Sequence, residues 1–215
     1  MSRRREPVFS FSEPAPVRFA GLLIVMHVLL TYTPFGDVEN TGRVFELWPL
    51  AVTDGIGWVG TLGHSLAHSD WTHVLLNGMM LVIFAIITMR GARAKGIRSG
   101  TTPRPERAFM LVFLTGVLGG ALAQWAWWAA IDADSARAVG ASGGVSALFA
   151  TAGYAIGGRD QMVKYGLAWA ALNAVFVLFP IFGPMAWPAH IGGFIGGMLV
   201  ASRLVSPGST TFGVT

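Results

Sequence analysis

The sequence predicts an all-α membrane protein, a bundle of six transmembrane helices with both the N and C termini in the cytosol. Composition is the first indication, because 53% of the 215 residues are hydrophobic and only 12% are charged, whereas soluble domains carry roughly 25% charged residues. The apolar residues also gather into stretches of roughly 20 residues, the length that a helix needs to cross a bilayer core. Finally, the basic residues lie mostly on one side of these stretches, which predicts their orientation.

The first three predicted spans are defined by their hydropathy. The span at 17–34 follows the arginines at 3–5, as a secretory signal would, but no small-residue cleavage site follows it, so we expect an uncleaved helix. The spans at 72–89 and 108–130 are apolar along most of their length. Tryptophans at 125–128 close the third span, which is typical of an aromatic belt at the membrane interface.

The last three predicted spans differ in character. The span at 140–157 is rich in Gly, Ala and Ser and is the least hydrophobic, which favours a central helix whose neighbours approach closely over small side chains. The spans at 165–182 and 189–205 follow after short connections. A lipid-facing helix would carry more leucine and isoleucine than the fourth span does.

Lysine and arginine give the orientation of the bundle. All but two of the fifteen lie on the side of the N terminus, the exceptions being Arg43 and Arg137. Because cytosolic loops carry the basic excess, the termini are predicted to be cytosolic and 35–71 to be an external loop. The net charge of +4 therefore requires no nucleic-acid partner. The predicted organisation is a cytosolic tail at 1–16, a transmembrane domain at 17–205 and a cytosolic tail at 206–215.

The available residue types limit the chemistry. The sequence has no cysteine, which excludes disulfides, thiolate metal sites and thiol nucleophiles. No Asp, Glu, Lys or Arg lies in the middle of a predicted span, whereas a proton-coupled transporter or ion pump is expected to bury one. The polar side chains at membrane depth are His27, His73, Asn77, Gln124, Ser142, Ser146, Asn173 and His190.

Four of these polar residues are predicted to share one depth, near the external side. The second, fourth and sixth spans all run inward. The first two turns of the second span carry His73 and Asn77, the first turn of the fourth carries Ser142, and the start of the sixth carries His190. A serine, an imidazole and further hydrogen-bond donors are the parts of nucleophilic acyl transfer. His190 could accept the proton of Ser142, because an unperturbed imidazole titrates near neutral pH.

The same four residues also supply a candidate oxyanion site. His73 and Asn77 are four residues apart, so they lie on one helix face, and the backbone N–H groups at the start of the fourth span favour developing negative charge. The sequence places no carboxylate nearby that could complete a triad. The hypothesis is therefore a dyad of Ser142 and His190, with oxyanion donors from His73 and Asn77.

Each motif has a simpler alternative in helix packing. The glycines of 140–144 could form a small-residue face between helices, and 190–197 could be a packed helix with one capped histidine. The stretch 140–144 also fits G-x-S-x-G, but the nucleophile elbow with that pattern needs a preceding strand and a soluble sheet. The pattern therefore does not indicate an α/β-hydrolase.

A metal site is the alternative for the histidines before and within the second span. His64, His68 and His73 have the spacing H-x3-H-x4-H. No HExxH motif accompanies them, and no obvious carboxylate ligand completes a site. We therefore expect no metal ion.

Taken together, these motifs resemble the rhomboid family of intramembrane serine proteases. The resemblance extends over roughly residues 17–205, with the motifs in the family's order and orientation. The family patterns G-x-S-G, A-H-x-x-G-x-x-x-G and H-x-x-x-N fall on Gly140, Ser142 and Gly143, on Ala189, His190, Gly193 and Gly197, and on His73 and Asn77.

The resemblance implies a rhomboid-like bundle whose short fourth helix is central and whose cavity opens to the outside. Ser142 would be the nucleophile, His190 the base, and His73 and Asn77 the oxyanion residues. Transmembrane segments of other proteins would be the substrates, entering laterally from the lipid bilayer, while 181–188 would resemble the family's mobile cap. The compact six-span form fits a multi-pass protein of a bacterial plasma membrane, and neither a cofactor nor a particular oligomeric state is implied.

Ser146 departs from the family, whose members usually carry an aromatic residue four positions after the nucleophile. The alternative function is a catalytically silent rhomboid-like scaffold that binds transmembrane helices. Silent relatives generally lack the dyad, so the presence of Ser142 and His190 favours the protease.

Overall fold

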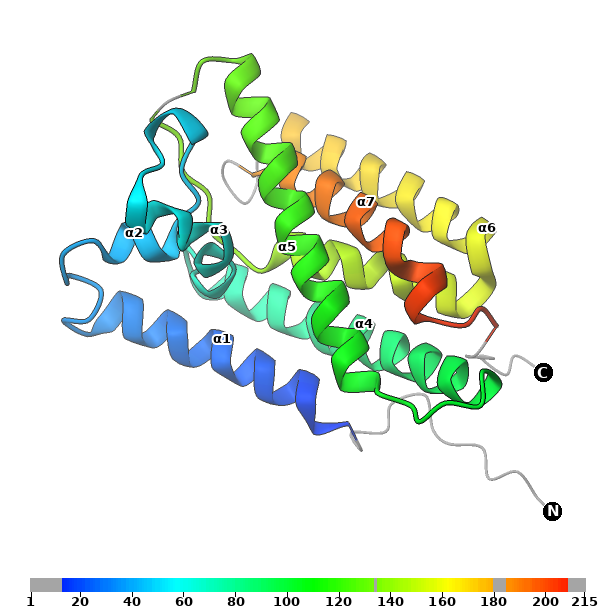
Figure 1. The fold of residues 1–215 in the computed structure, drawn as a ribbon. Coiled ribbons are helices and arrows are strands. Elements are labelled where there is room, and N and C mark those ends of the chain that lie inside the picture. The colour runs from blue at the N-terminus through cyan, green and yellow to red at the C-terminus, as the bar shows by residue number, and fades with distance from the viewer. Residues whose placement is uncertain (1–12, 134, 180–184, 209–215) are drawn as a thin grey trace.

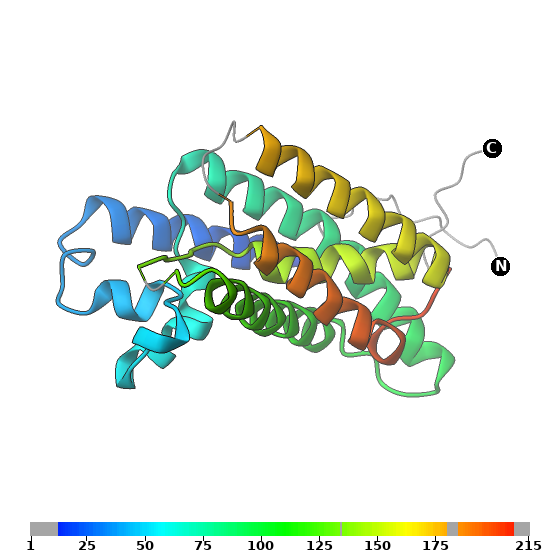
Figure 2. The same ribbon diagram turned by 90° about the horizontal axis from the view of Figure 1, so that it is seen from above.

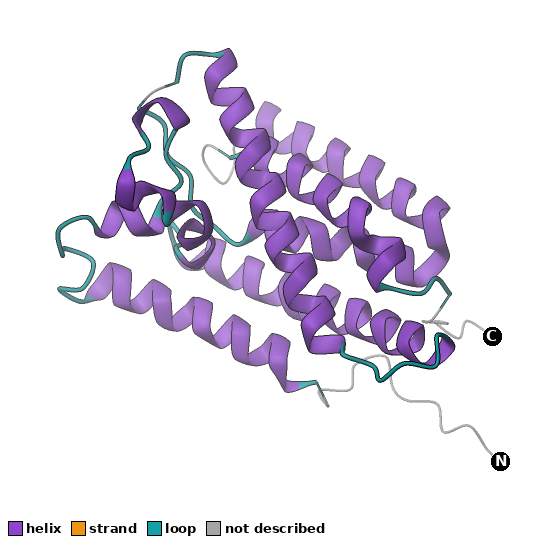
Figure 3. Ribbon diagram, viewed as in Figure 1, coloured by secondary structure: helices purple, strands orange, loops and turns teal. Residues whose placement is uncertain are grey.

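The computed structural model describes residues 13–133, 135–179 and 185–208. Over these residues the fold is all-helical, with seven α-helices, three short 3-10 helices and no strand (Figure 3). Most of the predicted tails at 1–16 and 206–215 lies outside the described residues, and so do 181–184 of the predicted cap.

Four helices in the described part of the chain are long and apolar enough to cross a membrane. The helix α7 (Trp187–Leu204), which has 18 residues, is not among these four. The four helices are α1 (Pro14–Tyr32), α4 (Trp71–Arg98), α5 (Pro105–Ala130) and α6 (Ser142–Leu178).

The helix α6 consists of two helical stretches joined by a kink. Gly157 and Gly158 have non-helical backbone angles there, and Gly158 has a φ of 70° and a ψ of −152°, a combination that essentially only glycine adopts. Figure 1 shows the chain turning back at this point, so that the two halves run in opposite directions. The first half lies over the predicted span at 140–157 and the second over that at 165–182.

Five short helices connect α1 to α4 and lie together at one end of the bundle (Figures 1 and 2). The beginning of α1 and the end of α7 lie at the opposite end. The short helices are α2 (Thr41–Phe45), η1 (Leu50–Val52), η2 (Gly55–Trp58), α3 (Gly60–Gly63) and η3 (His64–Leu66).

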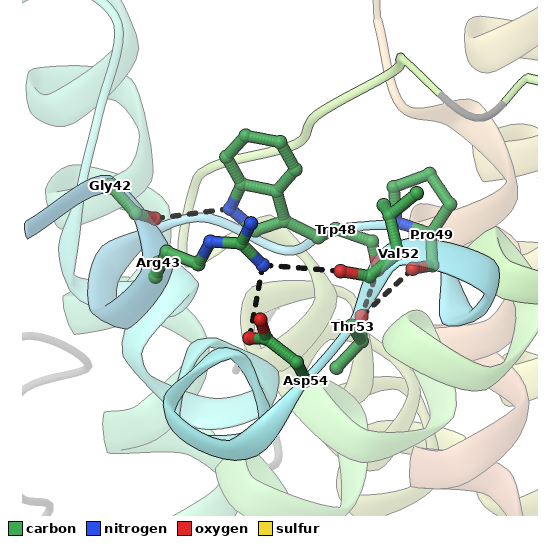
Figure 4. Close-up of polar contacts among 7 residues, drawn as sticks. All are labelled: Gly42, Arg43, Trp48, Pro49, Val52, Thr53 and Asp54. Carbon is green, nitrogen blue, oxygen red and sulfur yellow. Dashed lines mark hydrogen bonds and ion pairs between the residues drawn. The ribbon is translucent and has the colours of Figure 1, made fainter. Parts of the chain in front are cut away.

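Trp48, in this connecting segment, makes cation–π contacts with two arginines. The guanidinium of Arg43 lies 5.2 Å from the ring centroid of Trp48, and that of Arg137 lies 5.0 Å from it. Figure 4 shows Arg43 also donating to Asp54 Oδ1, at 3.0 Å. These are the two arginines that the sequence assigned to the external side. Cation–π contacts of this kind tie the segment to the one that precedes α6.

Glycines allow α7 to pack closely against two neighbouring helices. A Cβ atom at Gly193 would lie 2.2 Å from the carbonyl oxygen of Gly143 in α6, and one at Gly192 would lie 2.3 Å from that of Gly119 in α5. Backbone therefore touches backbone at both interfaces, as expected where small residues line helix contacts. This packing brings the first turn of α7 against the first turn of α6.

Candidate functional site

Ser142 is the first residue of α6, and the residues before it are fixed by two histidines. The N–H of Gly140 donates to the carbonyl oxygen of His64 at 2.8 Å, and the N–H of Ala141 donates to His68 Nε2 at 3.4 Å. Gly140 has a φ of 125°, which disfavours residues with a side chain. The start of α6 is therefore held in a defined position, with the orphan N–H groups of its first turn beside Ser142.

His73 of α4 lies against the same glycine. A Cβ atom at Gly140 would lie 2.8 Å from Nε2 of His73 and 3.7 Å from Oγ of Ser142. The imidazole and the hydroxyl therefore flank one backbone position. Both side chains are only partly buried, so a substrate could approach them.

Asn77 lies one turn further along α4 and is buried. Its Nδ2 donates to the backbone oxygen of His73 at 3.0 Å. A side-chain amide carries two hydrogens, and the hydrogen bonds of the described residues use only one of them. The second hydrogen can be donated to an oxyanion.

A chain of hydrogen bonds holds His73 from its other side. Asp70 caps α4 by accepting the backbone N–H of His73 at 2.9 Å, and its second oxygen accepts the hydroxyl of Ser69 at 2.7 Å. Ser69 Oγ lies 3.1 Å from Nδ1 of His73. Because the single hydroxyl hydrogen points to Asp70, Ser69 accepts from the protonated Nδ1 of His73.

The hydrogen bonds from Asp70 through Ser69 to His73 affect the charge at the site. The Ser69 hydroxyl and the backbone N–H of His73 hold the pKa of the Asp70 carboxyl below its usual value. Since Nδ1 of His73 is already a donor, Nε2 donates to an oxyanion only when the ring carries both protons. Burial of the ring opposes the second proton, whereas the anionic Asp70 stabilises it.

His190 lies in the first turn of α7 and is buried together with Asn173 from the second half of α6. Nδ1 of His190 lies 2.7 Å from Oδ1 of Asn173. The ring also packs on Trp169, with centroids 5.6 Å apart and planes 33° apart. Trp169 and Asn173 are four residues apart and so share one face of α6.

Ser146, at the position where members of the family usually carry an aromatic residue, makes a different contact. It is fully buried and its hydroxyl donates to the carbonyl oxygen of Ser142 at 2.7 Å. The aromatic ring that packs on His190 comes instead from Trp169. The family pattern indicates the position of Ser146 for this aromatic ring, whereas in this protein the ring belongs to Trp169 in the second half of α6.

The structure thus places the predicted site residues in two neighbouring groups. Ser142 and His73 flank Gly140, and Asn77 follows one turn later, while His190 enters beside Gly143 through the packing of Gly193. Within the described residues, no hydrogen bond joins Ser142 Oγ to His190. Catalytic hydrogen bonds are often long before substrate binds, so this separation is compatible with a dyad.

The histidines considered as metal ligands have other partners. Nδ1 of His64 lies 2.9 Å from the oxygen of Gly60, and Nε2 of His68 accepts from Ala141. Across 13–133, 135–179 and 185–208, no group of three or more His, Asp or Glu side chains is arranged to hold a metal ion.

Sequence comparison assigns a family to this arrangement. The family model of the Rhomboid domain matches residues 57–207, more than half of the chain, and the match includes His73, Asn77, Ser142 and His190. No curated protein matches the chain.

Proposed function

Since this chain belongs to the rhomboid family, we propose that it is an intramembrane serine endopeptidase that cleaves transmembrane segments of other membrane proteins. Its four long apolar helices make it a multi-pass membrane protein. The observation that carries the proposal is the position of Ser142 at the first turn of α6, beside the His73 ring and the turn of α7 that carries His190. Such a grouping of hydroxyl, imidazole and donors suits acyl transfer better than helix binding alone.

In the proposed acylation step, Ser142 Oγ attacks the carbonyl carbon of the scissile peptide bond. Its proton passes to Nε2 of His190, and a C–O bond forms as the carbonyl becomes a tetrahedral oxyanion. The oxyanion then collapses, the C–N bond breaks, and His190 returns the proton to the leaving amine. The result is an ester between Ser142 and the substrate.

The oxyanion would be stabilised by donors already present around Ser142. Asn77 offers its second amide hydrogen, and the start of α6 offers backbone N–H groups. His73 would add Nε2–H once its ring carries both protons. Preorganised donors of this kind are worth about 3 to 4 kcal/mol each in the transition state.

In the proposed second step, water hydrolyses the ester. His190 removes a proton from the water, whose oxygen attacks the acyl carbon, and Ser142 leaves with the proton that His190 held. Water must therefore reach the end of the bundle where α4, α6 and α7 begin. The partial exposure of Ser142 and His73 supports this requirement.

The proposal includes a topology and a location. Six spans would arise if α7 crosses the membrane and if the two halves of α6 cross separately, with cytosolic termini and the site near the external surface. The distribution of lysine and arginine supports this orientation. A bacterial plasma membrane suits such a protein.

Cleavage in reconstituted vesicles tests the proposal. The substrate would be a tagged single transmembrane helix with small, helix-destabilising residues in its outer half. We expect wild type and Ser202→Ala, a matched serine variant at the far end of α7, to cleave it, and Ser142→Ala and His190→Ala not to cleave it. Binding of the helix without cleavage by a folded wild type would instead identify a silent scaffold.

A further inference from the structure

The side chain of Asn173 makes a polar contact with the imidazole ring of His190. Asn173 is 3% exposed and His190 is 8% exposed, and Oδ1 of the one lies 2.7 Å from Nδ1 of the other. The contact joins the second half of α6 to the first turn of α7. The sequence patterns that pointed to Ser142 and His190 did not include Asn173.

The orientation of the Asn173 amide is fixed by a second hydrogen bond. Its Nδ2 donates to the backbone oxygen of Trp169 at 2.8 Å. A carbonyl oxygen can only accept, so the nitrogen of the amide must face Trp169 and the oxygen must face His190. These two contacts therefore distinguish the nitrogen of the Asn173 amide from its oxygen.

The oriented amide determines where His190 carries its proton. Oδ1 of Asn173 can only accept, so Nδ1 of His190 must be the donor in this contact. A neutral imidazole has one N–H, and therefore Nε2 carries the lone pair. That is the tautomer that a general base requires, since Nε2 must accept the serine proton.

The ring plane of His190 is restrained as well. Trp169 packs on it at 5.6 Å between centroids, and Phe149 packs on Trp169 at 5.7 Å. Rotation of His190 about its side-chain bonds would break both the ring contact and the hydrogen bond. One face of α6 therefore supplies both an acceptor and a stacking surface.

We propose that Asn173 is a positioning residue that holds His190 in the Nδ1–H tautomer, with Trp169 taking the place of the aromatic residue absent at Ser146. The inference rests on the proposed function. During the reaction the Nδ1–H···Oδ1 bond persists while Nε2 gains and loses its proton. A neutral amide performs this role without placing a carboxylate at membrane depth, which would be costly.

Three variants separate positioning from packing. Asn173→Leu removes the acceptor and keeps much of the volume, Asn173→Asp keeps an acceptor, and Leu172→Ala alters the adjacent residue, which is 40% exposed, as the matched control. The readouts are the rate of labelling by a fluorophosphonate probe as a function of pH, and ¹⁵N NMR of histidine-labelled protein in detergent.

We expect wild type and Leu172→Ala to react alike. Asn173→Leu should react at least about tenfold more slowly, a part of the about 10²–10⁴-fold that a positioned base contributes. Asn173→Asp should keep a rate within about tenfold of wild type, with the acid limb of its pH profile moved to higher pH, because a carboxylate favours the imidazolium.

The NMR measurement does not depend on activity. The chain has five histidines, and the His190 signals are those missing from His190→Ala. We expect a protonated Nδ1 and an unprotonated Nε2 in wild type, and loss of this pattern in Asn173→Leu.

The outcomes separate this inference from the proposed function. A reactive wild type with Asn173→Leu reacting at the same rate and the same pH dependence would overturn the role of Asn173 alone. A protonated Nε2 on neutral His190 would overturn it even if Asn173→Leu failed to fold. A folded wild type that does not react would contradict the proposed function, and with it the use of this contact in catalysis.

Discussion

The backbone N–H of Ala141 donates to Nε2 of His68 across 3.4 Å, which joins the residue before Ser142 to the loop before α4. Burial, and then the nearby His73 and His27, lowers the pKa of His68 to about 3. The ring therefore stays neutral near pH 7, and its Nε2 remains an acceptor. A protonated His68 could not accept this hydrogen bond.

The stability of the fold should depend on pH through His68. Its pKa of about 3 in the folded state lies below the usual 6.5, so between these pH values the unfolded chain binds a proton that the folded chain does not. Stability should then be full above the unfolded pKa and fall as pH decreases toward the folded one. Thermal unfolding in detergent at a series of pH values would measure this slope.

The variant His68→Leu should flatten that slope. It should also lower stability at neutral pH by about 1 to 3 kcal/mol, because the buried N–H of Ala141 loses its acceptor. An unchanged slope in His68→Leu would show that other groups cause the pH dependence.

Asp70 should have two separable roles, as the cap of α4 and as the anion behind Ser69 and His73. Asp70→Ala should lower stability by about 0.5 to 2 kcal/mol through loss of the cap. Asp70→Asn keeps a capping oxygen, so it should be nearly as stable as wild type but react more slowly with the fluorophosphonate probe. Equal reaction rates for Asp70→Asn and wild type would exclude the electrostatic role.

The capping contribution of Asp70 should itself depend on pH. Its pKa is lowered in the folded state, first by the Ser69 hydroxyl and then by the His73 N–H. The ionised carboxylate therefore stabilises the fold above the usual aspartate pKa, and this contribution is lost only as pH falls through the lowered value. Between neutral pH and about pH 5, the difference between wild type and Asp70→Ala should not decrease.

A methyl group at Gly197 should destabilise the bundle, whereas one at Gly21 should not. A Cβ at Gly197 would lie 2.4 Å from the carbonyl oxygen of Ala147, while one at Gly21 would have nothing within 4 Å. Overpacking costs about 1 to 3 kcal/mol, so Gly197→Ala should unfold at lower temperature in detergent than Gly21→Ala. If the two variants unfold together, the close approach of α6 and α7 is incorrect.

Asn77→Ala should slow the reaction without abolishing it. The variant removes one oxyanion donor but leaves Ser142, His190 and the N–H groups of α6 in place. We expect kcat and kcat/KM for peptide cleavage to fall together by about 10²- to 10³-fold, since the donor acts mainly in the transition state. A rise in KM at constant kcat would place Asn77 in substrate binding instead.

Hydropathy predicted the positions of the long helices well but not their ends. The predicted span at 72–89 lies inside α4, which continues to Arg98. The residues after Met89 include Arg90, Arg93, Lys95 and Arg98, so hydropathy excludes this stretch although its backbone remains helical. The kink at Gly157 and Gly158 lies at the end of the span predicted at 140–157, before the span predicted at 165–182 begins.

The contacts of His190 could not be predicted from the sequence. Asn173 is recognisable in the sequence as a polar residue at membrane depth, but the family pattern points only to the position four residues after Ser142 for the aromatic partner. The pairing of Trp169 and Asn173 with His190 depends on how the second half of α6 packs against α7. Contacts between these two helices determine that packing, and the spacing of residues in the sequence does not reveal which of their residues will meet.

The most direct test of the central claim, that His190 activates Ser142, is labelling of the purified, detergent-solubilised protein with a fluorophosphonate probe, with the adduct located by mass spectrometry. The account predicts an adduct on Ser142 in wild type and in Ser202→Ala, and none in Ser142→Ala or His190→Ala. A wild type that is folded and still unlabelled would contradict the account and favour a silent scaffold that binds transmembrane helices.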